Sequence, residues 1–211
     1  TGRNYIQNVD HCNTNSPFDP TVAPIRQSNL CLEIALPTKP LVGGYGKDRD
    51  DGEIALCTLA AFNLGEMHDD SDIEECAELA VRALDEILDF QDYPHPAALH
   101  AKGRRALGIG VVNYAYYLAK HGFNYSSENG NQLTHELFES IQYYCLKASN
   151  KLAAEKGVCD YYHETSYSKG VMPIDRYYKK TLDTFADFPL KQDWETLREL
   201  IRIYGLRNST L

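Results

Sequence analysis

The spacing of apolar residues predicts three long helices in the second two-thirds of the chain, over about residues 71–88, 133–155 and 194–204. In each range the apolar positions recur every three to four residues, which places them on one face of a helix. Residues that start or stop helices stand at the ends of these ranges. They are the capping box Ser71–Glu74, Gly157 after the second helix, and Asp193 and Gly205 around the third.

The first 65 residues have a different pattern, which predicts strands. Short apolar runs such as "LCLEIALP" and "EIALCTLAAF" lie on either side of the polar, glycine-rich residues 43–52, where a loop is expected. Further along, residues 107–122, "LGIGVVNYAYYLAKHG", predict a buried strand that turns into a helix. Strands that alternate with helices indicate an α/β fold.

Length, composition and charge narrow the class of protein. The 211 residues suffice for one large domain or part of a bigger one, and abrupt ends at Thr1 and Leu211 lead us to expect a single partial domain over 1–211. Hydrophobic residues make up 43% and charged residues 24%, as in ordinary folded proteins. The net charge is 21 − 30 = −9, which disfavours a DNA-binding protein but not one that binds a phosphorylated small molecule.

The apolar runs are too short for a membrane span, and we expect no membrane association. None of the six cysteines forms a Cys-x-x-Cys pair, so a zinc ribbon or a dithiol motif lacks support. The expected compartment is the reducing cytoplasm. Cys76 and Cys145 lie on the apolar faces of predicted helices, where cysteine commonly packs as a small hydrophobic residue. Gly108 and Gly110 resemble a nucleotide loop, but Asn113 replaces the third glycine, and close packing of a strand against a helix explains them better.

One short stretch carries more specific chemistry. Residues 29–33 read "NLCLE", and in an extended strand alternate side chains share a face. Asn29, Cys31 and Glu33 would then form a row about 13 Å long, opposite an apolar ridge of leucines. A plain half-exposed strand explains Asn29 and Glu33, but cysteine is unusual on a wet face unless its reactivity is used. Cys57 lies in the next apolar run, so two thiols on neighbouring strands are expected to form a thiol-dependent site.

Five segments also carry a resemblance to a known family. In order, they are "SNLCLEIALPTKP", "GEIALCTLAAFNLG", "GRRALGIGVVNYAYYLAK", "SKGVMPID" and "GLRNSTL". Together they resemble the central catalytic part of the large subunit of aerobic, class I ribonucleoside-diphosphate reductase, in its bacterial and bacteriophage form. The resemblance covers essentially the whole chain. It implies part of a ten-stranded α/β barrel, with Cys31 at the tip of an inner finger loop.

The resemblance also implies a role for each residue of the row. Cys31 would become a thiyl radical and abstract the hydrogen from C3′ of the ribose, and Glu33 would act as a base on the 3′-hydroxyl. Asn29 would orient the substrate, with Ser28 as a second substrate-binding residue. Cys57 would be one of two thiols that reduce C2′ as water leaves, and would end in a disulfide. The reaction would make deoxyribonucleoside diphosphates for DNA synthesis.

Several parts of such an enzyme are expected outside these residues. The resemblance implies that the thiol partner of Cys57 lies before Thr1, whereas the phosphate-binding segment lies after Leu211. It implies no cofactor on this segment. The radical would come from a metal-bearing, di-iron small subunit, ATP and dNTPs would act as effectors, and thioredoxin or glutaredoxin would re-reduce the disulfide. The segment alone is therefore expected to be inactive without the rest of the large subunit.

Other interpretations remain open at this point. The chain could be a split product that acts in assembly with a complementary polypeptide, because a partial barrel leaves open strand edges and apolar surface. A cobalamin-dependent, class II reductase shares a similar Asn-x-Cys-x-Glu row. An unrelated cysteine hydrolase would need His11 close to Cys31. For the adjacent pair His11 and Cys12, a polar turn is favoured over a metal site.

Overall fold

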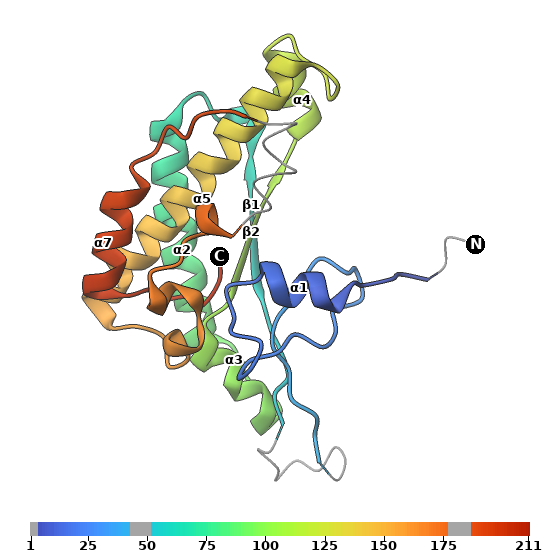
Figure 1. The fold of residues 1–211 in the computed structure, drawn as a ribbon, viewed down its shortest axis with the longest axis vertical. Coiled ribbons are helices and arrows are strands. Elements are labelled where there is room, and N and C mark those ends of the chain that lie inside the picture. Colours follow the sequence, from blue (N-terminus) through green and yellow to red (C-terminus); the bar gives the residue numbers. More distant parts are fainter. Residues whose placement is uncertain (1–3, 43–51, 177–186) are drawn as a thin grey trace.

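The computed structural model describes residues 4–42, 52–176 and 187–211. In these ranges the sheet has two parallel strands, β1 (Thr58–Asn63) and β2 (Leu107–Val112) (Figure 1). They pair in register, from Thr58 opposite Leu107 to Asn63 opposite Val112. Parallel strands need a long connection. Here that connection contains α2 (Asp70–Phe90) and α3 (Leu99–Arg104), so the unit is βαβ.

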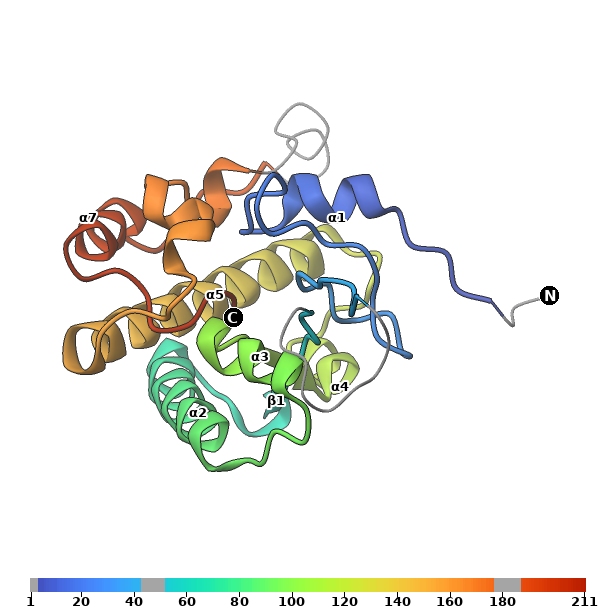
Figure 2. The same cartoon turned by 90° about the horizontal axis from the view of Figure 1, so that it is seen from below.

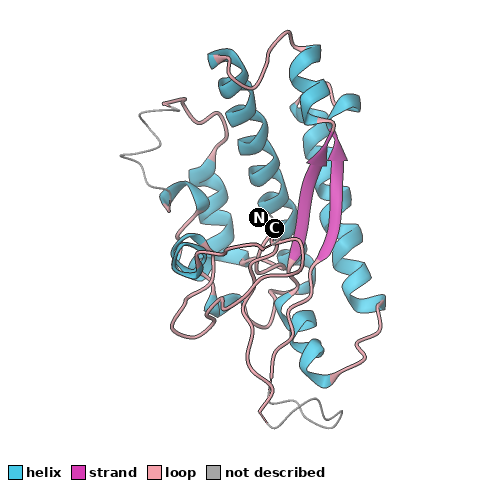
Figure 3. Ribbon diagram, turned by 90° about the vertical axis from the view of Figure 1, so that its right-hand side faces the viewer, coloured by secondary structure: helices cyan, strands magenta, loops and turns pink. Residues whose placement is uncertain are grey.

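Helices cover one face of the two strands. The long helix α5 (Glu128–Lys156) packs between α2 and α7 (Trp194–Tyr204), as Figures 2 and 3 show. A continuous apolar core joins α2, α5 and the strands, and its burial supplies most of the stability of this layer. Its buried members include Phe62, Leu64, Val81, Leu84, Leu88, Leu107, Ile141 and Leu152. The α/β fold class is thereby confirmed.

The three predicted helices are confirmed, with corrections at two of their starts. The first begins at Asp70 because the Asp69 carboxylate accepts the main-chain N–H groups of Ser71 and Asp72, so the predicted capping box at Ser71 is wrong. The second begins at Glu128, five residues earlier than predicted, behind the N-cap Ser127. The third has the predicted bounds and caps. Gly157 and Gly205 end their helices at φ values of 87° and 74°, which glycine adopts easily.

The predicted strand-to-helix segment is also confirmed, as β2 followed by α4 (Tyr114–Lys120). Within the described ranges, the remaining short helical turns have 3₁₀ geometry. They are η1 (Leu64–Glu66), η2 (Pro96–Ala98), η3 (Tyr162–Glu164), η4 (Ser166–Lys169) and η5 (Pro173–Asp175). None of the described helices combines the length and apolar composition needed to cross a membrane.

The prediction of strands over the first 65 residues is largely wrong. His11 and Cys12 lie in a helix, α1 (Val9–Asn15), and not in a polar turn. Between α1 and β1 the described backbone is mostly irregular, with isolated bridges that pair Ile25 with Pro37 and Lys39 with Glu53. Alternating apolar and polar residues form a strand only where a neighbouring strand offers hydrogen bonds to the main-chain N–H and C=O groups. The predicted glycine-rich loop at 43–52 falls, apart from its last residue, outside the described residues.

A buried ion pair and several hydrogen bonds tie α2, the end of α3 and the C-terminal segment together. Asp85 of α2 is fully buried and accepts hydrogen bonds from the Arg105 guanidinium (2.6 Å) and the Asn208 amide (3.1 Å). Leu107 N–H donates to the carbonyl of Thr210 at 3.1 Å, so the chain returns beside the start of β2. These contacts fix the strands that lie next to the site described below.

Candidate functional site

The "NLCLE" residues form a tight loop and not an extended strand. Leu32 N–H donates to the Asn29 carbonyl at 3.1 Å, which closes a turn, and Leu32 has a φ of 65° in the left-handed region. The predicted apolar ridge is therefore wrong. Leu30 is 89% exposed and Leu32 37%, and the first buried leucine after them is Leu36. Cys31 lies at the turn and is exposed.

Side-chain hydrogen bonds close the base of this loop. The Ser28 hydroxyl donates to the Ile34 carbonyl at 2.6 Å, and Ile34 N–H donates to Asn29 Oδ1 at 3.1 Å. The amide of Asn29 also donates to Glu33 Oε1 at 2.6 Å. The structure therefore joins Asn29 directly to Glu33, with Cys31 on the turn between them. The three side chains gather on one loop instead of lying in the predicted straight row.

Cys57 lies beside the base of this loop, one residue before β1. Burial, and to a smaller extent the negative charge of Glu33, together raise the pKa of its thiol to about 11. Gly108 of β2 leaves the space for the thiol. A Cβ on Gly108 would lie 3.0 Å from Cys57 Sγ and 3.9 Å from Ile34 Cδ1. Cys31 is on a loop, so the predicted pair of neighbouring strands is wrong, although loop and thiol do lie side by side.

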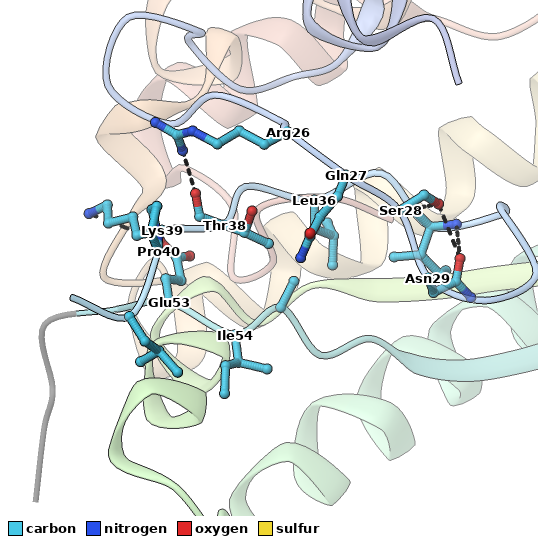
Figure 4. A pocket seen from close by; sticks show the side chains of 13 residues that line it. Arg26, Gln27, Ser28, Asn29, Leu36, Thr38, Lys39, Pro40, Glu53 and Ile54 are labelled. Atoms are coloured by element: carbon cyan, nitrogen blue, oxygen red, sulfur yellow. Dashed lines mark hydrogen bonds and ion pairs between the residues drawn. The ribbon is translucent and has the colours of Figure 1, made fainter. Parts of the chain in front are cut away.

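A cavity of about 590 Å³ opens next to the loop (Figure 4). Ser28 and Asn29 line one end, and Arg26 and Lys39 lie at the other. The guanidinium of Arg26 donates to the carbonyl of Thr38. The pattern of residues predicts no role for the two cations, because an isolated Arg or Lys has no periodicity or motif. Cys31 and Glu33 do not line this cavity.

The other candidate residues lie outside the loop. Two of them, Cys145 and Cys76, pack in or against the core, and His11 makes no bond to Cys31 in the described ranges. Cys145 is buried in the core, and burial raises its pKa to about 12, which confirms the packing interpretation. Cys76 is half-buried against the same core. In the described ranges no hydrogen bond or ion pair joins His11 to Cys31, and no cluster of His, Cys, Asp and Glu side chains there has the arrangement to hold a metal ion.

The site thus combines an exposed thiol, Cys31, with a bonded amide and carboxylate on one loop. A second thiol, Cys57, lies near Glu33 and Ile34 of that loop. The family model described as "Ribonucleotide reductase, barrel domain" matches residues 1–211, and the chain belongs to this family. This confirms the family resemblance seen in the sequence.

Curated relatives match over the full length of the chain. The alpha subunit of ribonucleoside-diphosphate reductase from Haemophilus influenzae is 63% identical over 212 residues. The alpha subunit of ribonucleoside-diphosphate reductase 1 from Escherichia coli K12 is 66% identical, and that of Enterobacteria phage T4 is 50% identical. Each match covers 100% of this chain but only 28%, 27% and 27%, respectively, of the relative.

Proposed function

We propose that this chain is part of the large subunit of a class I ribonucleoside-diphosphate reductase, and that residues 28–34 carry its radical chemistry. One observation carries the proposal. Asn29 and Glu33 are bonded at 2.6 Å around the exposed Cys31, and the thiol of Cys57 lies close enough for Glu33 to raise its pKa. Hydrogen-atom transfer by Cys31, proton transfer by Glu33 and reduction by Cys57 all act on one sugar, so these groups must lie close together.

The proposed reaction balances with two thiols. The thiyl form of Cys31 abstracts the hydrogen atom from C3′, so an S–H bond forms as the C3′–H bond breaks. Glu33 accepts the proton of the 3′-hydroxyl, and the 2′-hydroxyl leaves as water. Cys57 and a second thiol together supply two electrons and two protons and become a disulfide; one proton leaves in the water and the other ends on C2′. Cys31 then returns its hydrogen atom to C3′ and regains the thiyl radical, and Glu33 returns its proton to the 3′-oxygen. The net change is one C–OH converted to C–H, with one water and one disulfide formed.

The environment of Cys57 suits its proposed part. With a pKa of about 11, the thiol keeps its proton at neutral pH, as a hydrogen donor must. Asn29 and Ser28 line the cavity and are proposed to contact the substrate there. The amide of Asn29 already holds Glu33. It is therefore proposed to link the cavity, where the substrate would lie, to the base Glu33.

The remainder of the subunit is proposed to complete the site. We propose that β1 and β2 belong to a ten-stranded barrel with residues 28–34 as an inner finger loop, and that 1–211 is one partial domain of it. Support comes from Leu59, 59% exposed on β1, and Val112, 48% exposed on β2, which leave an apolar face for further barrel elements to cover. The relatives' greater length leaves room for the second thiol, the phosphate contacts and the ATP and dNTP sites.

The partners follow from the same proposal. A di-iron small subunit would supply the radical, and thioredoxin or glutaredoxin would reduce the disulfide. All six cysteines are free in the structure, which suits a reducing compartment such as the cytoplasm.

The test replaces Cys31 by serine in the complete subunit, assayed with its small subunit. Formation of deoxyribonucleoside diphosphate should fall to background, because an O–H bond is too strong to replace the thiol, whereas nucleotide binding should persist. Cys76→Ser on α2 is the matched control and should keep its activity. Normal product formation by Cys31→Ser would contradict the proposal.

A further inference from the structure

We propose that Ser28 is a positioning residue, whose hydroxyl sets the geometry of the loop that carries Cys31 and Glu33. The inference rests on the proposed function, and it assigns Ser28 a task beyond contact with substrate. The hydroxyl of Ser28 joins the two ends of the loop, since it donates to the carbonyl of Ile34 at 2.6 Å across six residues.

The hydroxyl has one hydrogen and two candidate acceptors. The Ile34 carbonyl lies at 2.6 Å and Asn29 Oδ1 at 3.2 Å, so the shorter contact takes the hydrogen. What Ser28 can offer a substrate is then its oxygen lone pairs. It can accept a hydrogen bond from a ribose hydroxyl or a base N–H, but it has no hydrogen left to donate.

The side chains of Ser28 and Asn29 make the main-chain hydrogen bonds to Ile34 that a neighbouring strand would make in a sheet. The carbonyl of Ile34 is bonded by the side chain of Ser28, and its N–H is bonded by the side chain of Asn29 at 3.1 Å. Both main-chain groups of Ile34 are therefore satisfied without a sheet. These bonds matter because Leu32 holds a left-handed conformation, which is unfavourable for leucine and is not self-supporting.

The anchored residue links the loop to the second thiol. Ile34 directly follows Glu33, and its Cδ1 and the Sγ of Cys57 both approach the same point above Gly108. A shift of the Ile34 main chain therefore moves Glu33 relative to Cys57. Without the Ser28 hydroxyl the Ile34 carbonyl loses its partner, so the loop samples positions in which the base and both thiols no longer meet one substrate.

The experiment compares Ser28→Ala and Ser28→Thr in the complete enzyme, with Ser126→Ala as the matched control. Ser126 is an exposed serine whose hydroxyl donates to a neighbouring asparagine, Asn124, at 2.9 Å, away from the site. In Ser28→Ala, kcat should fall about five- to tenfold, and KM for the ribonucleoside diphosphate should rise by a smaller factor, through the lost substrate contact. Ser28→Thr, which restores the hydroxyl, should recover most of kcat.

A second measurement is independent of activity. Hydrogen exchange of the Leu32 and Ile34 amides, without substrate, should be about five- to tenfold faster in Ser28→Ala and near normal in Ser28→Thr and Ser126→Ala. Unchanged exchange in Ser28→Ala would overturn the positioning role whatever the activity. A raised KM with unchanged kcat would overturn it too, because Ser28 would then act by binding substrate. Faster exchange alongside a fully active Cys31→Ser enzyme would uphold the positioning role and refute the proposed function.

Discussion

Replacement of Gly108 by alanine should disturb the second thiol of the site while leaving the strand intact. Gly108 lies in β2 with ordinary extended geometry, so its backbone accepts alanine. The added Cβ would lie 2.5 Å from Leu59 Cδ2 and 3.0 Å from Cys57 Sγ. Favourable contacts between heavy atoms lie at about 3.5–4.0 Å, so both neighbours must move by about half an ångström or more.

Leu59 and Cys57 differ in how easily they can move away from the added Cβ. In this chain Leu59 is 59% exposed, and its flexible side chain can change rotamer more easily than the thiol can move. Cys57 is half-buried and has a single side-chain torsion before its sulfur, so the thiol itself must rotate away. Overpacking costs about 1–3 kcal/mol, and the change from glycine to alanine returns about 0.4–1 kcal/mol through the unfolded state. We expect a net loss of about 1–2 kcal/mol in unfolding free energy.

Gly110 supplies the matched control two residues along the same strand. A Cβ there meets nothing within 4 Å, so Gly110→Ala should be neutral or slightly stabilising. Urea denaturation measures stability, and single-turnover product yield in the complete enzyme reports on Cys57. Gly108→Ala should lower the yield severalfold more than its stability loss explains. Indistinguishable behaviour of the two variants in both assays would refute the placement of Cys57 against Gly108.

Two further predictions concern titration and the buried ion pairs. The alkylation rate of Cys57 should rise with a midpoint near pH 11 instead of the ordinary 9.0, leaving about one thiolate in a thousand at pH 8. Because this pKa is raised in the folded state, the stability that Cys57 contributes should be complete below about pH 9 and lost as pH rises through about 11. A midpoint near pH 9 by mass-spectrometric mapping would contradict the burial of the thiol. Asp85→Asn should lower the unfolding free energy by about 3 kcal/mol, because it leaves the buried Arg105 guanidinium, 2.6 Å away, with only partial compensation from Asp89. Glu199→Gln, which breaks an exposed pair with Arg202, should cost about 0.5 kcal/mol or less, and equal urea midpoints for the two variants would count against the Asp85 network.

The helical layer was predictable because periodicity and caps agree there. The helix over Trp194–Tyr204 has both its predicted ends, since Asp193 caps its start and Gly205 takes the φ that stops it. The start of the helix over Asp70–Phe90 was predicted wrongly, because two possible capping residues stand close together there. Asp69 and Ser71 are both good N-caps, and only the three-dimensional path of the backbone selects Asp69.

The site residues were predictable by type, but their geometry was not. Alternation in "NLCLE" is the pattern of a strand, yet the loop is closed by bonds from the side chains of Ser28 and Asn29 to the main chain of Ile34. Such bonds have no periodicity. The partner strand that would have made an extended segment stable is absent from the described residues beside it. Gly108 is a similar case, because only the fold reveals that its missing side chain leaves room for Cys57.

The most direct test of the central claim separates the two thiols with a substrate labelled with tritium at C3′. In the complete enzyme, Cys57→Ser should still release label from C3′ while it forms no normal deoxynucleotide, because Cys31 and Glu33 remain intact. Cys31→Ser should release no label. Label release by Cys31→Ser, or normal product from Cys57→Ser in a single turnover, would contradict the roles proposed for Cys31 and Cys57.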